Sequence, residues 1–250
     1  MICSLLSSHL PLLNSFSLIL SKYSNKVGSK NKLRRFRENE QFDNVVQPSR
    51  EELTQNNYPL RGKWQSDFFK NNNPIVLELG CGKGEYSVAL AQAYPEKNFI
   101  GVDIKGARFW RGAKTGMEEN ITNLGFIRTQ IELVDQIFAE NEIDEIWITF
   151  PDPQIKYKRT KHRLTNSEFL QKYKFILKPD GIVNLKTDSE FMHGYTLGLL
   201  HGEGHEILQA NHDVYKNVYS PKEVTGIQTF YEKQYLEQGK PITYIQFKIK

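Results

Sequence analysis

Apolar positions follow two alternating spacings along the chain from residue 74 onward. Short runs rich in β-branched residues alternate with longer stretches in which apolar residues recur every three or four positions. This alternation is typical of an α/β protein, in which repeated βα units build a parallel sheet. The pattern predicts strands near 75–79, 98–102, 125–130, 144–150, 181–186, 205–211 and 242–250, and helices near 84–94, 105–121, 131–140, 165–177, 189–201 and 226–239.

The segment before residue 74 lacks this alternation of apolar spacings. Residues 1–26 begin with an apolar, serine-rich run, but they lack the basic start and small-residue cleavage site of a secretory signal peptide. Because Val27 can be encoded by an alternative start codon, we hypothesise that these residues lie upstream of the start used in the cell. Residues 27–73 indicate a basic arm with little regular structure, followed by one α/β domain over 74–250.

The amino-acid composition excludes only a few classes of protein. The chain has 250 residues and a formal net charge of +4, with basic residues concentrated near 30–37 and 156–163. Its two cysteines, Cys3 and Cys81, form neither a disulfide framework nor a metal-type pair, which favours a reducing cytoplasm. His201 and His205 are separated by glycines that interrupt a helix, so we expect no metal site. We also expect no membrane span, because no apolar run has the necessary length.

A glycine-rich loop follows the first predicted strand of the domain. In "VLELGCGKGEY", Gly80 and Gly82 let the backbone approach a ligand closely at the start of a helix. A dinucleotide fingerprint would need glycine at Glu85, and the carboxylate of Glu78 would repel a pyrophosphate. Asp103 ends the next strand, where it can accept ribose hydroxyls. Two acids around such a loop fit S-adenosylmethionine, whose amine and sulfonium are positive.

A further acid follows the strand at 144–150. Pro151 and Pro153 restrict the backbone around Asp152 at the carboxyl edge of the sheet, where open α/β folds bind ligands. The basic tract 156–163 comes next, with Tyr157 and His162 interleaved. Cations with aromatic residues suit phosphate contacts and base stacking, and the cluster at 30–37 extends them into a polyanion track.

The residues leave four other functions to be considered. A nicotinamide-dependent dehydrogenase is disfavoured by Glu78 and Glu85. A methyltransferase for a base amino group typically has an Asn/Asp-Pro-Pro-aromatic loop, and here Gln154 follows Pro153. A non-catalytic RNA-binding subunit with the same fold stays open, as does a nucleic-acid methyltransferase acting on another base atom.

The chain resembles the bacterial tRNA (guanine-N7-)-methyltransferases. The resemblance runs from about Lys32 to the C-terminus, through "KLRRF", "ELGCGKGEY", "GVDIKGAR", "FPDPQIKYKRTKHRL", "LKTD" and the late T-x-[FY]-E motif. It implies a seven-stranded Rossmann-like S-adenosylmethionine-dependent methyltransferase sheet with the last strand antiparallel. It also implies a guanosine in the tRNA variable loop as methyl acceptor, so tRNA is the expected partner of a monomer or homodimer.

The resemblance assigns roles to matching residues. It implies cofactor contacts by Glu78, Gly80, Gly82, Asp103, Gln130 and Asp152, and substrate contacts by Lys156, Asp188, Thr229, Phe230, Tyr231 and Glu232. It implies RNA contacts by Lys158, Arg159, Thr160, Lys161, His162 and Arg163. Asp152 is the expected catalytic residue, stabilising positive charge on the purine, while Asp188 or Glu232 would bind the guanine N1 and N2 edge.

The chain departs from the family pattern at a few positions. The pattern commonly reads Pro-Asp-Pro-Trp-Pro-Lys, and Gln154 and Ile155 replace the Trp and the second Pro. Arg159 stands where a histidine is common, and Gln130 where an acid or asparagine is common. All the predicted carboxylates are retained.

Overall fold

The computed structural model describes residues 31–55 and 58–250. Residues 1–26, which we hypothesised to be an upstream extension, lie outside the described residues. One sheet organises the described chain, in the strand order β1-β4-β3-β2-β5-β6-β8-β7. The strands are β1 (Val45–Val46), β2 (Ile75–Leu79), β3 (Asn98–Val102), β4 (Leu124–Ile127), β5 (Ile143–Thr149), β6 (Leu177–Thr187), β7 (Glu206–Asn211) and β8 (Thr243–Lys248).

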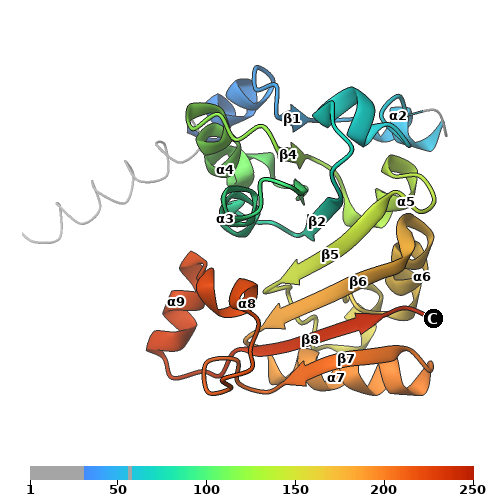
Figure 1. The fold of residues 1–250 in the computed structure, drawn as a ribbon, viewed down its shortest axis with the longest axis vertical. Coiled ribbons are helices and arrows are strands. Elements are labelled where there is room, and N and C mark those ends of the chain that lie inside the picture. Colours follow the sequence, from blue (N-terminus) through green and yellow to red (C-terminus); the bar gives the residue numbers. More distant parts are fainter. Residues whose placement is uncertain (1–30, 56–57) are drawn as a thin grey trace, which may run out of the picture.

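The direction of the strands places all the predicted loops at one edge. β1 to β6 pair in parallel, whereas β8 lies antiparallel between β6 and β7. In Figure 1 the arrowheads of β5 and β6 point toward α8 and α9, and β8 points the opposite way. The expected antiparallel last strand is therefore confirmed. The loops after β2, β3, β4, β5 and β6 meet at the carboxyl edge of the sheet.

Helices cover both faces of the sheet (Figure 1). α3 and α4 pack together on β3 and β4, while α6 and α7 pack on β6 and its neighbours. The helices are α2 (Arg50–Thr54), α3 (Glu85–Ala93), α4 (Gly106–Glu118), α5 (Val134–Ile137), α6 (Ser167–Ile176), α7 (Glu190–Gly202), α8 (Lys222–Gly226) and α9 (Phe230–Glu237). Shorter turns are the π-helix η1 (Trp64–Phe69) and the 3-10 helices η2 (Ile131–Leu133) and η3 (Tyr157–His162).

Two hydrophobic cores follow from the two-residue alternation of the strands. Along β2, Ile75, Leu77 and Leu79 face the core beneath α5, α6 and α7, whereas Val76 faces the core beneath α3 and α4. Glu78 comes two residues after Val76 in the same strand, so its side chain lies on the same face, toward α3. This alternation buries a carboxylate under the glycine-rich loop.

The N-terminal segment differs from its prediction. The sequence predicted an irregular basic arm over 27–73, but residues 31–39 are helical and β1 adds an eighth strand to the expected seven. Trp64 and Phe69 are buried in the same core as β2, and the Trp64 indole N–H donates to the Ile137 carbonyl at 3.2 Å. The prediction of an irregular segment is wrong. Trp64 and Phe69 are buried by contacts with the rest of the domain, and such contacts leave no local periodic pattern in the sequence.

Candidate active site

The glycine-rich loop makes a turn whose backbone conformation glycine adopts far more easily than other residues. Gly80, Gly82 and Gly84 all have positive φ angles, of 83°, 57° and 75°. A Cβ at Gly84 would also lie 2.6 Å from the ring of Phe126. The loop thus brings the N-terminus of α3 to the carboxyl edge of the sheet with its backbone exposed to a ligand.

Asp103 supports this loop from the end of β3. Its Oδ2 accepts the Gly82 N–H at 3.1 Å, and its Oδ1 accepts the Lys105 N–H at 2.7 Å. Each carboxylate oxygen can accept a further hydrogen bond, so the side chain keeps capacity for a hydroxyl-bearing ligand. The arrangement agrees with the predicted place of Asp103 beside the glycine-rich loop.

Glu78 lies below the loop. One of its oxygens accepts both the N–H and the hydroxyl of Ser87, and the other accepts the Thr149 hydroxyl at 2.6 Å. Burial raises the pKa of Glu78 to about 7, the neighbouring charge of Asp103 adds to this, and the Ser87 and Thr149 hydrogen bonds oppose it. Glu78 therefore ties α3 to β5 and contributes negative potential beneath the loop.

These elements border one cleft of about 310 Å³. Gly80 and Asp103 line it together with Ile104, whose side chain is 49% exposed. An exposed apolar side chain next to polar groups suits the face of a purine. Gln130, the predicted cofactor residue after β4, lies at the same cleft, as do Gln154, Arg159 and His162 from the loop after β5.

Asp152 sits in a strained turn. Phe150 has φ of 48° and Gln154 has φ of 46°, so non-glycine residues on both sides adopt left-handed backbone. A bulky residue in this region costs free energy and persists only where surrounding contacts hold it, a feature of functional sites. The Phe150 N–H bonds the Lys186 carbonyl at 2.8 Å, and the Gln154 N–H bonds Asp152 Oδ1 at 3.1 Å. The Asp152 carboxylate is exposed and held at the carboxyl edge.

The basic tract after Asp152 forms η3. Tyr157 is 92% exposed, and the other exposed side chains of the tract are cationic. They are Lys156, Lys158, Arg159 and Lys161, with Thr160 and His162 half-buried. Gln154 and Arg159, two positions that depart from the family pattern, contact each other, because Arg159 Nε donates to Gln154 Oε1 at 3.0 Å.

Arg163 does not join this surface. Its side chain is buried, its Nε and Nη2 donate to the carbonyls of Gln154 and Ile155 at 3.2 Å, and its guanidinium stacks on Phe191 and Tyr195. Arg163 holds the loop after Asp152 in place, and its predicted contact with RNA remains a prediction. The aromatic partners on α7 could not be inferred from the local basic run.

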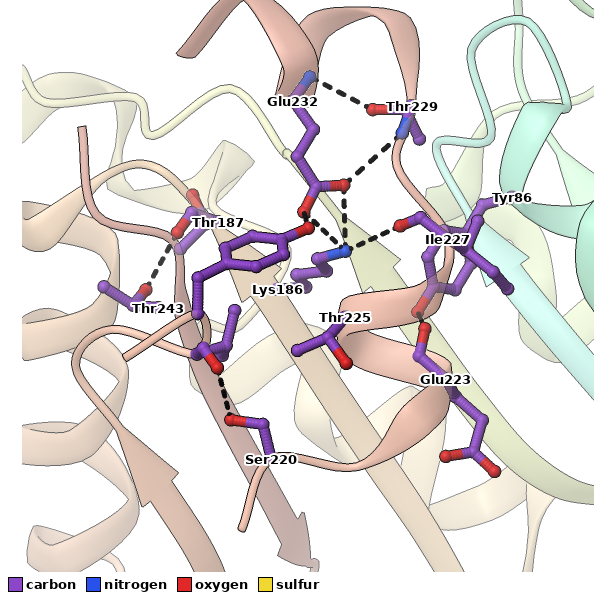
Figure 2. Close-up of polar contacts among 12 residues, drawn as sticks. Tyr86, Lys186, Thr187, Ser220, Glu223, Thr225, Ile227, Thr229, Glu232 and Thr243 are labelled. Atoms are coloured by element: carbon purple, nitrogen blue, oxygen red, sulfur yellow. Dashed lines mark hydrogen bonds and ion pairs between the residues drawn. The ribbon is translucent and has the colours of Figure 1, made fainter. Parts of the chain in front are cut away.

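Glu232 lies in a buried ion pair. It is fully buried, and both of its carboxylate oxygens lie within 2.8 Å of Lys186 Nζ, which donates a third hydrogen bond to the Ile227 carbonyl (Figure 2). The Tyr215 hydroxyl adds a hydrogen bond of 2.7 Å to Glu232. With Thr229, Glu232 also forms a capping box that starts α9. Glu232 therefore positions Lys186 and the start of α9, and its predicted contact with the substrate remains a prediction.

The start of α9 is joined to the glycine-rich loop. The Phe230 N–H donates to Glu85 Oε2 at 3.0 Å, and Lys83 Nζ lies 3.6 Å from the centroid of the Phe230 ring. The rings of Phe230 and Tyr231 remain 46% and 43% exposed. The predicted substrate segment therefore presents two aromatic side chains next to the glycine-rich loop. Asp188 lies at the end of β6, half-exposed, 3.6 Å from Lys240 Nζ.

Sequence reasoning missed several residues of this arrangement. Lys186 is the most informative, since a cation inside an apolar strand needs a buried partner. Burial lowers its pKa, while the Glu232 carboxylate opposes the shift. The capping-box spacing of Thr229 and Glu232 could also have indicated a helix start. Lys83 and Glu85 carry no local signal for their contact with α9.

The described residues were also checked for metal and membrane features. Within residues 31–55 and 58–250, no three His, Cys, Asp or Glu side chains are grouped so that they could share a metal ion. No helix in the same ranges has both the length and the apolar character needed to cross a bilayer.

Comparisons with known proteins find matches over most of the chain. A family model described as "Putative methyltransferase" matches residues 72–245. A tRNA (guanine-N(7)-)-methyltransferase of Christiangramia forsetii is 77% identical over 224 residues, covering 90% of this chain and 100% of the relative. A protein of the same name from Porphyromonas gingivalis is 52% identical over 190 residues, covering 76% of this chain and 77% of the relative.

Solved structures share the fold at low identity. The 16S rRNA methyltransferase KamB superposes with a TM-score of 0.56 at 14% identity, covering 81% of this chain and 94% of that chain. A 30S ribosomal A1408 methyltransferase from an uncultured bacterium gives a TM-score of 0.54 at 18% identity, covering 73% and 90%. These structures therefore share the α/β fold of this chain.

Proposed function

Because this chain belongs to the tRNA (guanine-N(7)-)-methyltransferase family, we propose that it methylates N7 of a guanosine in the tRNA variable loop, using S-adenosylmethionine. The product is 7-methylguanosine. The observation that supports the proposal is the strained turn at Phe150 and Gln154, which holds Asp152 two residues before Gln154, a residue that lines the cleft together with Gly80 and Asp103.

The cleft fits S-adenosylmethionine. Asp103 keeps acceptor capacity for ribose hydroxyls, Ile104 offers an apolar surface to the adenine, and Gly80 and Gly82 leave the backbone open. Gln130 adds an amide at the rim. When bound, S-adenosylmethionine supplies an electrophilic methyl group on a positively charged sulfur. The negative charge of Asp103 favours a cationic ligand at this position, and Glu78 adds to it when ionised.

The residues around the cleft serve alignment and charge stabilisation. Guanine N7 has a lone pair and no proton, so methyl transfer requires no general base, and orientation of the acceptor lowers the barrier. As the new N7–carbon bond forms and the sulfur–carbon bond breaks, positive charge moves onto the purine. Asp152 stabilises that charge. Asp188 or Glu232 accepts from the guanine N1 and N2 edge, and Lys156 contacts a phosphate or O6.

The test is labelled methyl transfer to unmodified bulk tRNA, followed by nucleoside digestion and mass analysis. We expect 7-methylguanosine from the wild type, and a loss of about 100-fold or more in kcat for Asp152→Asn with tRNA affinity retained. Asp180→Asn is the matched control, because Asp180 is 97% exposed on β6 and its one ion pair within the described residues is with Lys248. The control should methylate normally.

Other outcomes would separate the alternatives. If the wild type binds tRNA but transfers no methyl group, the chain is a binding subunit with a methyltransferase fold. If a different methylated nucleoside appears, the acceptor atom is wrong while the methyltransferase assignment holds. If Asp152→Asn and Asp180→Asn are equally active, Asp152 is not the catalytic carboxylate.

A further inference from the structure

A basic hollow lies next to the cofactor cleft. It forms where helical residues 31–39 pack against the start of α4, and its volume is about 600 Å³. Among the described residues that line it there are five cations and no acid. The cations are Lys32, Arg35, Lys105, Arg108 and Arg128. A site of this composition is complementary to an anion.

The cations are held in place without being neutralised. The guanidinium of Arg35 lies 4.8 Å from the Trp110 ring, and that of Arg128 lies 4.6 Å from the Phe36 ring. Stacking on aromatic faces orders a guanidinium but leaves its donors available. None of the five cations takes part in an ion pair within the described chain, and Arg35 Nε is buried there without a hydrogen-bond partner.

The position of the hollow relates it to the reaction. Ile104 lines both the hollow and the cofactor cleft, and Arg159 and His162 border the cleft as well. A polyanion lying across the cleft would therefore meet η3 on one part of its path and the hollow on another. Arg128 directly follows β4, and Lys105 comes two residues after Asp103 at the end of β3, so both belong to the carboxyl edge of the sheet.

We propose that this hollow binds backbone phosphates of the tRNA, at a separate place from the tract 156–162. This inference rests on the proposed function, since it takes tRNA as the partner. Phosphate contacts by Lys and Arg fix the register of a nucleic acid and carry no sequence information. The hollow thus orients the tRNA body, while the tract 156–162 and Asp152 engage the region of the methylated base.

The experiment compares two double variants in full-length protein. Lys105→Gln with Arg108→Gln removes two exposed charges that have no described hydrogen-bond or ion-pair partner. Lys63→Gln with Lys174→Gln removes the same charge from exposed positions near the amino end of β5, the opposite edge. Binding of an unmodified tRNA transcript is measured over a series of potassium chloride concentrations, alongside tRNA KM, kcat and S-adenosylmethionine Kd.

The first double variant should raise the tRNA Kd about tenfold or more and reduce the slope of log affinity against log salt by about 1 to 2. KM for tRNA should rise, while kcat at saturating tRNA and the Kd for S-adenosylmethionine should stay within about twofold of the wild-type values. The second double variant should match the wild type. Equal slopes for both double variants would overturn the proposal, and so would a loss of cofactor affinity, which would make the hollow part of the cofactor site. If the wild type binds tRNA with this salt dependence but forms no 7-methylguanosine, the proposed function fails and the phosphate site stands.

Discussion

Replacing Lys186 with methionine should strongly destabilise the protein. Its ammonium lies 2.7 and 2.8 Å from the two Glu232 oxygens and 3.0 Å from the Ile227 carbonyl, and neither charged side chain is exposed. Lys186→Met leaves the Glu232 carboxylate buried with only Tyr215 and Thr229 as donors. Removing one member of a buried ion pair costs about 3–5 kcal/mol, a large part of a typical stability of about 5–15 kcal/mol.

The partner variant and the double variant isolate the ion pair. Glu232→Gln should also cost about 3–5 kcal/mol, because it leaves the Lys186 ammonium buried without its counter-charge. The double variant Lys186→Met with Glu232→Gln removes both charges, and its main remaining penalty is the lost donor at Ile227, about 1–3 kcal/mol. The double variant should therefore be more stable than either single variant. The coupling free energy should be at least about 3 kcal/mol.

Urea denaturation followed by circular dichroism and tryptophan fluorescence measures these free energies at neutral pH. Lys248→Met is the matched control, since the Lys248–Asp180 pair lies at the surface with Asp180 97% exposed. Its cost should be a small fraction of that of Lys186→Met. If the costs of the two single variants simply add in the double variant, or if Lys186→Met costs no more than the control, the buried pair does not stabilise the fold in the way described.

Three further predictions concern the glycine-rich loop and the strand that precedes it. Gly84→Ala should abolish S-adenosylmethionine binding in calorimetry and lower Tm, because φ is 75° and the new Cβ would lie 2.6 Å from Phe126; binding at wild-type affinity would contradict this. Burial raises the pKa of Glu78 to about 7 from 4.5, so the folded protein keeps a proton that the unfolded chain releases, and stability from this group falls by up to about 3 kcal/mol as pH rises from 4.5 to 7. Glu78→Gln should remove that part of the pH dependence in urea titrations, and an unchanged pH profile would show that Glu78 does not titrate there. Glu85→Ala removes the acceptor of the Phe230 N–H, so KM for tRNA should rise several-fold with cofactor Kd unchanged; equal rises in both would instead place its effect in the loop.

The sequence predicted the parallel part of the fold well because its strands are buried on both faces and read as continuous apolar runs. Predicted strands at 75–79 and 98–102 coincide with β2 and β3, and 144–150 differs from β5 by one residue at each end. The two-residue strand β1 was missed because it is too short to show any period. Aromatic residues in the N-terminal segment were read as part of an irregular arm, since their burial depends on the rest of the domain.

The candidate site was predictable where chemistry follows strand ends, and less so where it depends on distant contacts. Asp103 and Asp152 were found from strand ends, and the structure places both at the expected edge. Arg163 was grouped with its neighbours by charge, although tertiary aromatic contacts bury it. Lys186 and Glu232 lie 46 residues apart, so their pairing left no local pattern.

The place of β8 has a consequence for how the sheet is completed during synthesis. β8 comes last among the strands in the sequence, yet it lies between β6 and β7 in the sheet. Until it pairs, β6 presents an open edge and β7 has no neighbour in the described sheet, and unpaired edges are prone to wrong pairing with other chains. A nascent or truncated chain that stops before Thr243 should therefore hold the cofactor half of the fold while exposing an aggregation-prone half-sheet.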